Sequence, residues 1–418
     1  MCLIRKIMCY KNLRIVLSLV IAAQLLLRSE GFAQLYSSAE LDKRYDMVLK
    51  NPSVEIESTD AINHLYNFRF YEADREIRWL KYRFPHHPMP HFMLALAEWW
   101  KIVPNTNVTQ YDDKMIMHLD SAIYLAKRLY GDVENKVEPA FFLAASYAFK
   151  GRLHSERKQW AKATFAGKNA LKYLEECKGK GELSPELLFG DGIYNYYAQW
   201  IPREYPALKP ILAFFPKGNK ELGIKQLEEV ANQAFYTRTE ARYFLLQIYS
   251  MENEYNKAYE LAKYMHQTYP NNPYFERYYC RTAFVTARAQ EAQAAALRIL
   301  QKIEEGKPGY EGVSGRNAAY VLGFYAYNLQ RDFSSAKEYY QKAVEFSRQT
   351  GDTKAGYFIA SLIGLGKIAQ HENKVEEATN YYKEAMNAAS KKSAQYKEAK
   401  EAIDSLKKER RRQRRAKS

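Results

Sequence analysis

Small and aromatic side chains recur at related spacings along this chain, and the recurrence constrains its fold more than any other feature. The clearest copy lies near the C-terminus and consists of Leu365, Gly366, Ala369, Val375, Ala378, Tyr382 and Ala385. At such positions in a helix-turn-helix unit, small residues let two helices approach, and large residues fill the space between neighbouring units. The pattern therefore predicts stacked pairs of helices.

Partial copies of this pattern lie further upstream. The better ones are Phe333, Ala336, Tyr340 and Ala343, and Tyr249, Tyr255, Ala258, Ala262 and Pro270; the weaker ones are Ala292, Phe70 with Ala73 and Pro85, and Trp160 with Ala163 and Ala170. Ala292 follows Ala258 by 34 residues, whereas the steps to Ala336 and then Ala378 are 44 and 42 residues. Some repeats must therefore have longer helices or loops. FPHHP and YPNNP predict two helices that stop in the same way, because a residue before proline disfavours the helical conformation.

The spacing resembles the tetratricopeptide (TPR) consensus, a helix-turn-helix repeat of about 34 residues. The resemblance is strongest between residues 236 and 390. It implies an all-α fold, an α-solenoid of TPR-like repeats, and a scaffold that binds a protein or peptide without catalysing a reaction. Composition favours the same fold class, because Gly and Pro are few and the chain has many runs rich in Ala, Leu, Lys and Glu.

The first 33 residues have the pattern of a secretory signal peptide. Basic residues reach Arg14, an apolar stretch runs from Ile15 to Leu27, and Gly31 and Ala33 supply the small residues that signal peptidase prefers. We expect cleavage after Ala33 and export to the periplasm or the exterior, with an uncleaved membrane anchor as the alternative. The remaining regions are expected to be N-terminal helical repeats (34–178), a helical insert with Pro and Gly (179–235), C-terminal TPR-like repeats (236–390), and a helical extension with a basic tail (391–418).

The formal net charge of +15 is concentrated at the two ends of the chain. The tail KKERRRQRRAKS, from Lys407 to Ser418, lacks aromatic residues that could stack on bases, so we expect no nucleic-acid partner. It could instead contact acidic lipid head groups or an acidic partner. The alternative is a helical or frayed, solvated extension that has no dedicated partner. A peripheral membrane or envelope-associated protein, targeted by this tail or by an uncleaved first helix, is therefore the alternative to a simple scaffold.

No catalytic motif is evident in the sequence, so we predict no enzyme activity, cofactor or metal site; an enzyme site built on the proline-rich stretch 200–216 is a third hypothesis. His86, His87 and His91 could supply metal ligands, but prolines 85, 88 and 90 are expected to hold this segment extended as a linker. Gly364-x-Gly366-Lys367 is superficially similar to a phosphate loop, but lies where the repeat needs small residues for packing.

Two cysteines, Cys177 and Cys280, remain after the predicted signal. They could pair in an oxidising compartment. The alternative is two isolated, partly buried thiols, because a solenoid keeps distant repeats apart.

The resemblance also implies where a partner would bind. In TPR proteins, ligands usually lie along the face formed by the first helix of each repeat, and the register set by Ala258, Ala292, Ala336 and Ala378 carries that face over to particular positions. These are Tyr243, Gln247, Arg277, Arg281, Tyr325, Asn328, Lys367 and Gln370. Such a face would be polar and mildly cationic, with aromatic platforms, and could hold a carboxylate or an acidic peptide. The alternative is that these residues are merely solvated.

Overall fold

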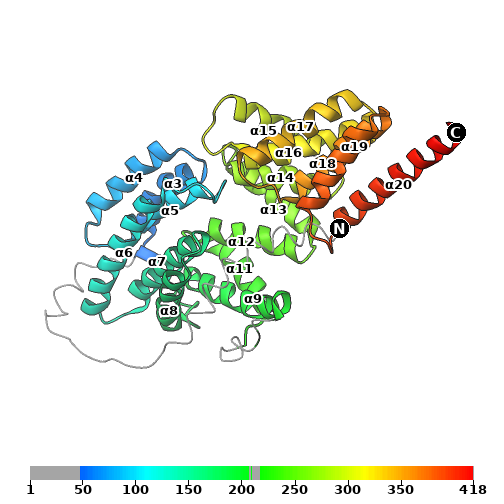
Figure 1. Cartoon of the computed structure of the whole chain (residues 1–418). Coiled ribbons are helices and arrows are strands. Elements are labelled where there is room, and N and C mark those ends of the chain that lie inside the picture. Colours follow the sequence, from blue (N-terminus) through cyan, green and yellow to red (C-terminus); the bar gives the residue numbers. More distant parts are fainter. Residues whose placement is uncertain (1–47, 207–208, 210–216, 418) are drawn as a thin grey trace. The chain divides into compact units, whose positions relative to one another are not determined.

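A computed structural model describes residues 48–206, 209 and 217–417, and within that part of the chain every regular element is helical (Figure 1). The predicted signal peptide lies outside these residues, as does most of the segment 207–216. The described chain forms two compact units, divided between Ile248 and Tyr249. We refer to them as the N-unit (48–248) and the C-unit (249–417). None of the described helices is both long enough and apolar enough to cross a bilayer.

The N-unit begins with a short 3-10 helix and continues through helices of 14 to 21 residues. In chain order these elements are η2 (Val48–Lys50), α3 (Pro52–Tyr66), α4 (Phe70–Arg83), α5 (Pro88–Ile102), α6 (Asp112–Asp132), α7 (Val137–Glu156), α8 (Trp160–Cys177), η3 (Pro185–Leu187), α9 (Leu188–Glu204), α11 (Lys220–Gln233) and α12 (Arg238–Met251). Most successive helices pack against each other.

The C-unit contains the helices that follow α12 in the chain. Its elements are α13 (Tyr255–Thr268), α14 (Pro273–Val285), α15 (Ala289–Glu304), α16 (Gly312–Tyr325), the π-helical turn η5 (Ala326–Gln330), α17 (Phe333–Gln349), α18 (Gly356–His371), α19 (Val375–Ala388) and α20 (Ala394–Lys417). Helices α14, α16 and α18 are the first helices of successive pairs, and they also pack on one another. The all-α solenoid of TPR-like helix pairs is thus confirmed.

One type of turn joins the two helices of a pair in both units. A non-glycine residue with positive φ occupies each of these turns, and the six residues are Phe68, Lys158, Asn253, Ala287, Arg331 and Asn373. In five of the turns the next residue donates its N–H to the carbonyl five residues earlier, as from Lys374 to Ala369. This is the Schellman pattern, which satisfies carbonyls at the end of the first helix. The separations of 34, 44 and 42 residues along Asn253, Ala287, Arg331 and Asn373 match the predicted repeat steps.

Glycines of α18 lie against tyrosine rings of the neighbouring helices. A Cβ on Gly366 would lie 2.6 Å from the Tyr382 ring of α19, and a Cβ on Gly364 would lie 2.4 Å from the Tyr340 ring of α17. The packing role predicted for these glycines is confirmed, and their place inside a continuous helix rules out a phosphate loop there.

Two helices end before proline as predicted. Phe84 and Tyr269 close α4 and α13 with nearly the same backbone angles, φ/ψ of −126°/64° and −127°/70°. The next helices begin at Pro88 and Pro273, each as an N-terminal proline. The prediction that residues 85–91 stay extended is wrong for its second half, because proline is well tolerated in the first turn of a helix.

The cysteines are isolated. Cys177 and Cys280 are both buried free thiols, each in a different unit. Burial raises the pKa of each thiol to about 12, so neither is readily ionised at neutral pH.

Candidate partner-binding face

Cationic and aromatic side chains gather on the stacked helices α14, α16 and α18 of the C-unit. We call this set the Arg–aromatic face; it consists of Tyr274, Arg277, Arg281, Phe284, Arg316, Tyr320, Phe324 and Tyr357. The ring of Phe284 lies 5.9 Å from that of Tyr320 and 5.0 Å from that of Phe324, centroid to centroid. Tyr320 continues the row to Tyr357 at 4.7 Å. An aromatic row therefore crosses three successive first helices.

Two arginines of α14 flank the row, and each lies over a tyrosine one turn or less away. The Arg277 guanidinium is 5.3 Å from the Tyr274 ring centroid, and that of Arg281 is 5.5 Å from the Tyr278 centroid. Arg277 also donates to Ser314 Oγ at 3.1 Å. Burial lowers the pKa of Arg277, although the guanidinium stays charged at any physiological pH. These two predicted residues are brought onto one face.

Arg316 adds a third guanidinium that the sequence analysis missed. Its Nη1 pairs with Asp352 Oδ2 at 2.8 Å, and only 5% of the residue is exposed. Its buried Nε has no hydrogen-bond partner among the described residues. An unsatisfied buried N–H is costly, so an acceptor supplied by a ligand would be favoured here. No spacing in the sequence points to Arg316, because its neighbours come from another helix and a loop.

The π-helical turn η5 explains why two other predicted residues fall off this face. It adds one residue to the first helix of its pair, so that Asp332 donates to Ala326, six residues back. Gly323, not Phe324, then packs against the Tyr340 ring, as Gly366 does against Tyr382. The register taken from Ala336 is therefore wrong by one residue along α16, and Tyr320 and Phe324 take the face positions.

The remaining predicted residues of the C-unit occupy different surroundings. Tyr325 is 4% exposed and its ring packs at 5.7 Å from that of Phe284. Asn328 is exposed and donates to the carbonyl of Phe324. Lys367 is exposed and pairs with Glu398 of α20 at 2.7 Å, and Gln370 accepts a hydrogen bond from Tyr382 at 3.3 Å.

Tyr243 and Gln247 belong to the N-unit, so the structure does not bring them onto the Arg–aromatic face. The Tyr243 hydroxyl accepts from Arg152 Nη2 at 2.6 Å, and its ring meets that of Trp100. Gln247 is 6% exposed and donates to the Tyr243 carbonyl at 3.4 Å. A role in partner binding stays a prediction for all eight residues.

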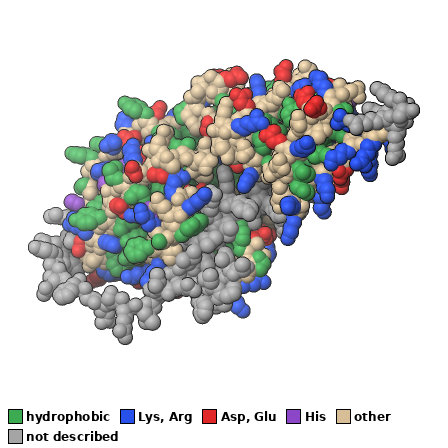
Figure 2. Space-filling model, in the orientation of Figure 1, with side chains coloured by type: hydrophobic (Ala, Val, Ile, Leu, Met, Phe, Trp, Pro, Cys, Tyr) green, Lys and Arg blue, Asp and Glu red, His purple; other side chains and the backbone are tan. Residues whose placement is uncertain are grey.

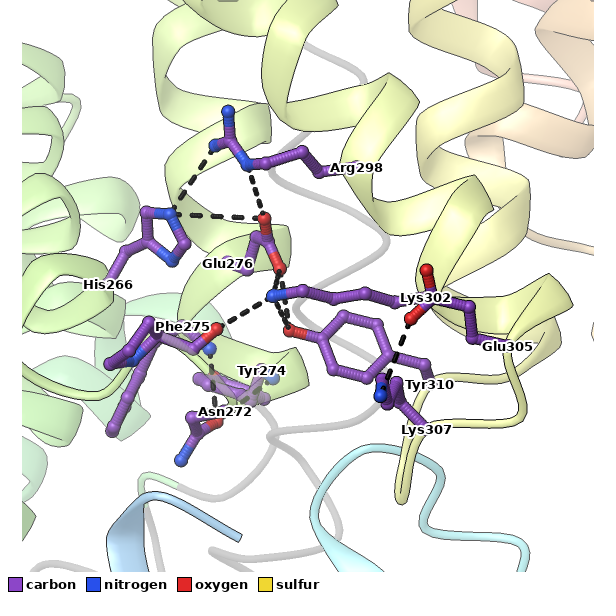
Figure 3. Close-up of polar contacts among 11 residues, drawn as sticks. His266, Asn272, Tyr274, Phe275, Glu276, Arg298, Lys302, Glu305, Lys307 and Tyr310 are labelled. Carbon is purple, nitrogen blue, oxygen red and sulfur yellow. Dashed lines mark hydrogen bonds and ion pairs between the residues drawn. The ribbon is translucent and has the colours of Figure 1, made fainter.

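A cluster of titratable groups in the C-unit surrounds Glu276 of α14 (Figure 3). The carboxylate accepts from Arg298 Nε at 3.0 Å, Lys302 Nζ at 2.8 Å and the Tyr310 hydroxyl at 2.5 Å. Burial alone would raise the pKa of Glu276, but the hydrogen bonds from Lys302 and Tyr310 outweigh it and hold the pKa below its ordinary value. Because Glu276 is fully buried, we interpret the cluster as a structural junction of α13, α14 and α15 and the loop that follows.

The three histidines of residues 86–91 do not converge. His87 caps α5, where its Nδ1 accepts from the N–H of Met89 at 3.1 Å, and burial lowers its pKa to about 3. His91 lies one turn inside α5. Across the described residues, no three His, Cys, Asp or Glu side chains are placed to share a metal ion.

Comparison with known proteins adds little to this picture. No protein-family model matches the chain, and no curated protein matches it. Among solved structures, the crystal structure of yeast Tom70 is similar over 90% of this chain and 93% of that chain, with 13% sequence identity and a TM-score of 0.29. A TM-score of 0.29 does not establish a shared fold. The helix pairs and their turns define the solenoid.

Proposed function

We propose that this protein is a non-catalytic scaffold that holds an extended, acidic peptide segment of a partner protein on the Arg–aromatic face. The observation that carries the proposal is the convergence of Arg277, Arg281 and Arg316 with an aromatic row on three stacked helices. Guanidinium groups bind carboxylates through paired, charge-assisted hydrogen bonds. Aromatic rings beside them supply apolar contact area at little cost in conformational entropy.

The proposal places this work outside the cytoplasm, for example in envelope assembly or export. Its support is the N-terminal pattern alone, a basic start followed by an apolar stretch and small residues before Gln34. Mass spectrometry of the protein from its native host would test this directly. A mature N-terminus at Gln34 is the expected result, and protein found in the cytoplasm with residues 1–33 intact would contradict it.

The binding proposal is tested on an array of synthetic dodecapeptides of varied charge, probed with the purified mature protein. We expect the bound peptides to be enriched in Asp, Glu and a free C-terminal carboxylate, because three arginines face them. Arg281→Glu should weaken binding at least about tenfold, as expected when a charged pair becomes a repulsive one. Lys342→Glu is the matched control, since Lys342 is an exposed cation of α17, outside the face.

Two results would overturn the proposal. One is a bound set with no preference for acidic peptides. The other is equal weakening by Arg281→Glu and Lys342→Glu, which would show that only the overall charge matters. Circular dichroism of both variants would first establish that their helices are intact.

One observation favours a second function, contact with an acidic membrane surface. Helix α20 follows the last helix pair and packs against α19 through Ala399, Ile403 and Leu406. Figure 2 shows Lys and Arg side chains toward its C-terminal end. Lys407, Lys408, Arg410, Arg411 and Arg412 are all exposed. Deletion of residues 407–418 should weaken salt-sensitive binding to vesicles with anionic lipid. Equal binding of the full and shortened proteins would exclude this role.

A further inference from the structure

Exposed aromatic side chains gather on the second helices of the N-unit, a surface that the proposed scaffold does not use. Among the described residues, Tyr264 of α13 is the one exposed aromatic residue outside these helices. The others lie on α4, α6 and α8 and are Tyr71, Trp79, Tyr82, Tyr124, Trp160 and Phe165. Single apolar residues on a surface are ordinary, but a concentration on a few helices marks an interaction site.

The three helices are neighbours. Helix α4 packs against α3 and α5, α6 packs against α5 and α7, and α8 packs against α7 (Figure 1). Lys81 of α4 lies close enough to His118 of α6 to act on it electrostatically. The Tyr130 ring of α6 lies 5.7 Å from the Tyr173 ring of α8, centroid to centroid. We call the exposed side chains of α4, α6 and α8 the outer face of the N-unit.

Cations outnumber acids on this outer face. The exposed acids are Asp113, Asp120 and Glu175. All four cations of α4 are exposed, whereas its three acids are only partly exposed. The exposed cations of the three helices are Arg75, Arg78, Lys81, Arg83, Lys114, Lys127, Arg128, Lys162 and Lys172.

The ion pairs of α4 turn their positive ends outward. The side chain of Arg75 is 67% exposed and that of its partner Glu76 is 28% exposed. For Arg78 and its partner Asp74 the values are 62% and 37%. A surface that approaches α4 therefore meets guanidinium groups and aromatic rings before it meets carboxylates. The charge of the outer face is complementary to an anionic surface.

The way in which rings and cations alternate favours a lipid surface over an acidic protein. The centre of a protein interface is a continuous apolar area that is depleted of charge. Tyr71 and Tyr82 lie on one side of α4, about three turns apart, and Arg75 and Arg78 lie between them on that side. A membrane interface needs no continuous apolar centre, because Trp and Tyr rings sit singly among the lipid head groups and cations pair with the anionic lipids around them.

We propose that the outer face of the N-unit docks on the surface of an anionic lipid bilayer. The rings of Tyr71, Trp79 and Tyr82 lie among the head groups, and the cations of α4 pair with the lipid phosphates. This contact requires neither the Arg–aromatic face nor residues 407–418. Its failure can therefore be told apart from the failure of either proposed function.

Vesicle cosedimentation of the mature protein, with and without residues 407–418, tests the proposal. We expect both forms to bind vesicles of phosphatidylethanolamine and phosphatidylglycerol. Both should bind vesicles of phosphatidylcholine at least about tenfold more weakly, because a zwitterionic surface attracts cations little. Equal binding to the two kinds of vesicle would overturn the anionic assignment. Failure of the shortened protein to bind the anionic vesicles would overturn the proposal and leave an acidic protein as the partner of the outer face.

Substitution of the tyrosines tests the aromatic part of the contact. Tyr71→Ser and Tyr82→Ser in the full mature protein should each weaken binding to the anionic vesicles by roughly threefold or more, because a ring loses its place in the interface. Tyr264→Ser is the matched control, since Tyr264 is an exposed tyrosine of α13, away from the outer face. Equal effects of the three substitutions would contradict the proposal. Circular dichroism would first establish that the helices are intact.

Charge reversal tests the cationic part. Arg75→Glu should weaken binding to the anionic vesicles by about fivefold or more, because each cation near an anionic membrane contributes to attraction. Lys342→Glu makes the same change in net charge at an exposed position of α17 and should have a smaller effect. Equal losses would show that only the overall charge of the protein matters, and would overturn docking through α4.

Tryptophan fluorescence gives a readout that loss of folding would not mimic. Trp79 is 52% exposed, whereas Trp99, Trp100 and Trp200 are buried. Anionic vesicles whose lipids carry bromine near the head-group end of an acyl chain should quench the fluorescence of the bound protein, and Trp79→Phe should remove much of this quenching. Bound protein without quenching would contradict insertion of the rings. Unchanged quenching in Trp79→Phe would place the contact on another surface.

Discussion

The two units share a turn but differ in what lies inside their helix pairs. In the C-unit, glycines and alanines face tyrosine rings directly, as Gly366 faces Tyr382. In the N-unit, the small residues of α7 face a cavity of about 540 Å³. Small residues therefore have two uses in one chain. They allow close packing where a large ring meets them, and they leave room where none does.

Glu276 is expected to show the largest effect, because its fully buried carboxylate is held by Arg298 and Lys302. Glu276→Ala removes the carboxylate that Arg298, Lys302 and Tyr310 share, and it should lower the free energy of unfolding by about 3–5 kcal/mol. Urea denaturation measures the loss in free energy of unfolding, and hydrogen exchange shows whether α13–α15 lose protection. Glu345→Ala, at an exposed position on α17, is the control and should stay within about 0.5 kcal/mol. A loss below about 1 kcal/mol in the first variant would show that the cluster does not stabilise the C-unit.

Two glycine substitutions test the difference in packing. Gly366→Ala should cost about 1–3 kcal/mol, because the Tyr382 ring is fully buried and cannot move aside. In the N-unit, a Cβ on Gly190 would lie even closer to its neighbour, at 2.2 Å from Leu174 Cδ1. Leu174 lines the cavity, however, and its side chain can move into that space. We expect Gly190→Ala to be neutral or to stabilise by up to about 1 kcal/mol, since alanine favours a helix. Similar losses in the free energy of unfolding in both variants would show that the two units do not differ in how their glycines are packed.

Acid should weaken the N-unit through its buried histidines. Burial lowers the pKa of His87 to about 3, while an unfolded histidine keeps its ordinary value near 6.5. The folded state therefore loses stability as pH falls below 6.5, by about 2 kcal/mol at pH 5 for His87. His91, whose pKa burial lowers to about 4, adds to the loss in the N-unit. In the C-unit, burial lowers the pKa of His266 to about 4, so this unit is weakened through one such histidine and the N-unit through two.

His87→Asn tests this pH dependence, because asparagine can still cap α5 but does not titrate. Thermal unfolding measured from pH 7 to pH 5 should change less for the variant than for the natural protein. An identical slope would show that His87 is not the source. The lowered pKa of Glu276 acts in a different range, since its stabilisation is complete above about pH 4.5 and is lost below it.

Substitutions in the turn that both units share should have the smallest effect on stability, and the effect should be the same in both units. Lys158 and Ala287 have φ of 58° and 59°, a region that costs a residue with a Cβ but not glycine. Lys158→Gly and Ala287→Gly should each stabilise the protein by up to about 1 kcal/mol. Calorimetry would measure both. Opposite signs in the two units would show that the turns are not equivalent.

The sequence predicted most of the fold, because the evidence for it is local. Gly366 and Tyr382 lie in one helix pair, and FPHHP and YPNNP mark helix ends within a few residues. The π-helical turn was missed because the register of α16 was carried back from Ala336 alone, and the extra residue lies upstream of that alanine. That one residue displaced the predicted face to Tyr325 and Asn328. Helical periodicity alone does not reveal where a turn has been widened.

The rest could not be predicted, because it depends on residues far apart in the chain. Arg152 of α7 donates to the hydroxyl of Tyr243 on α12, and nothing in their spacing indicates that they meet. Arg316 pairs with Asp352 from a loop before the next helix. Only the packing of the helices brings such groups together.

Photo-cross-linking in the native host tests the central claim most directly. The photoreactive residue p-benzoylphenylalanine would replace Phe324 on the Arg–aromatic face and, separately, Tyr264 on α13. Tyr264 is 45% exposed and Phe324 is less exposed, so random collisions would favour adducts at Tyr264. We predict a discrete adduct with a partner protein from position 324 that Arg281→Glu removes. An adduct from position 264 with none from position 324 would contradict the proposed binding face.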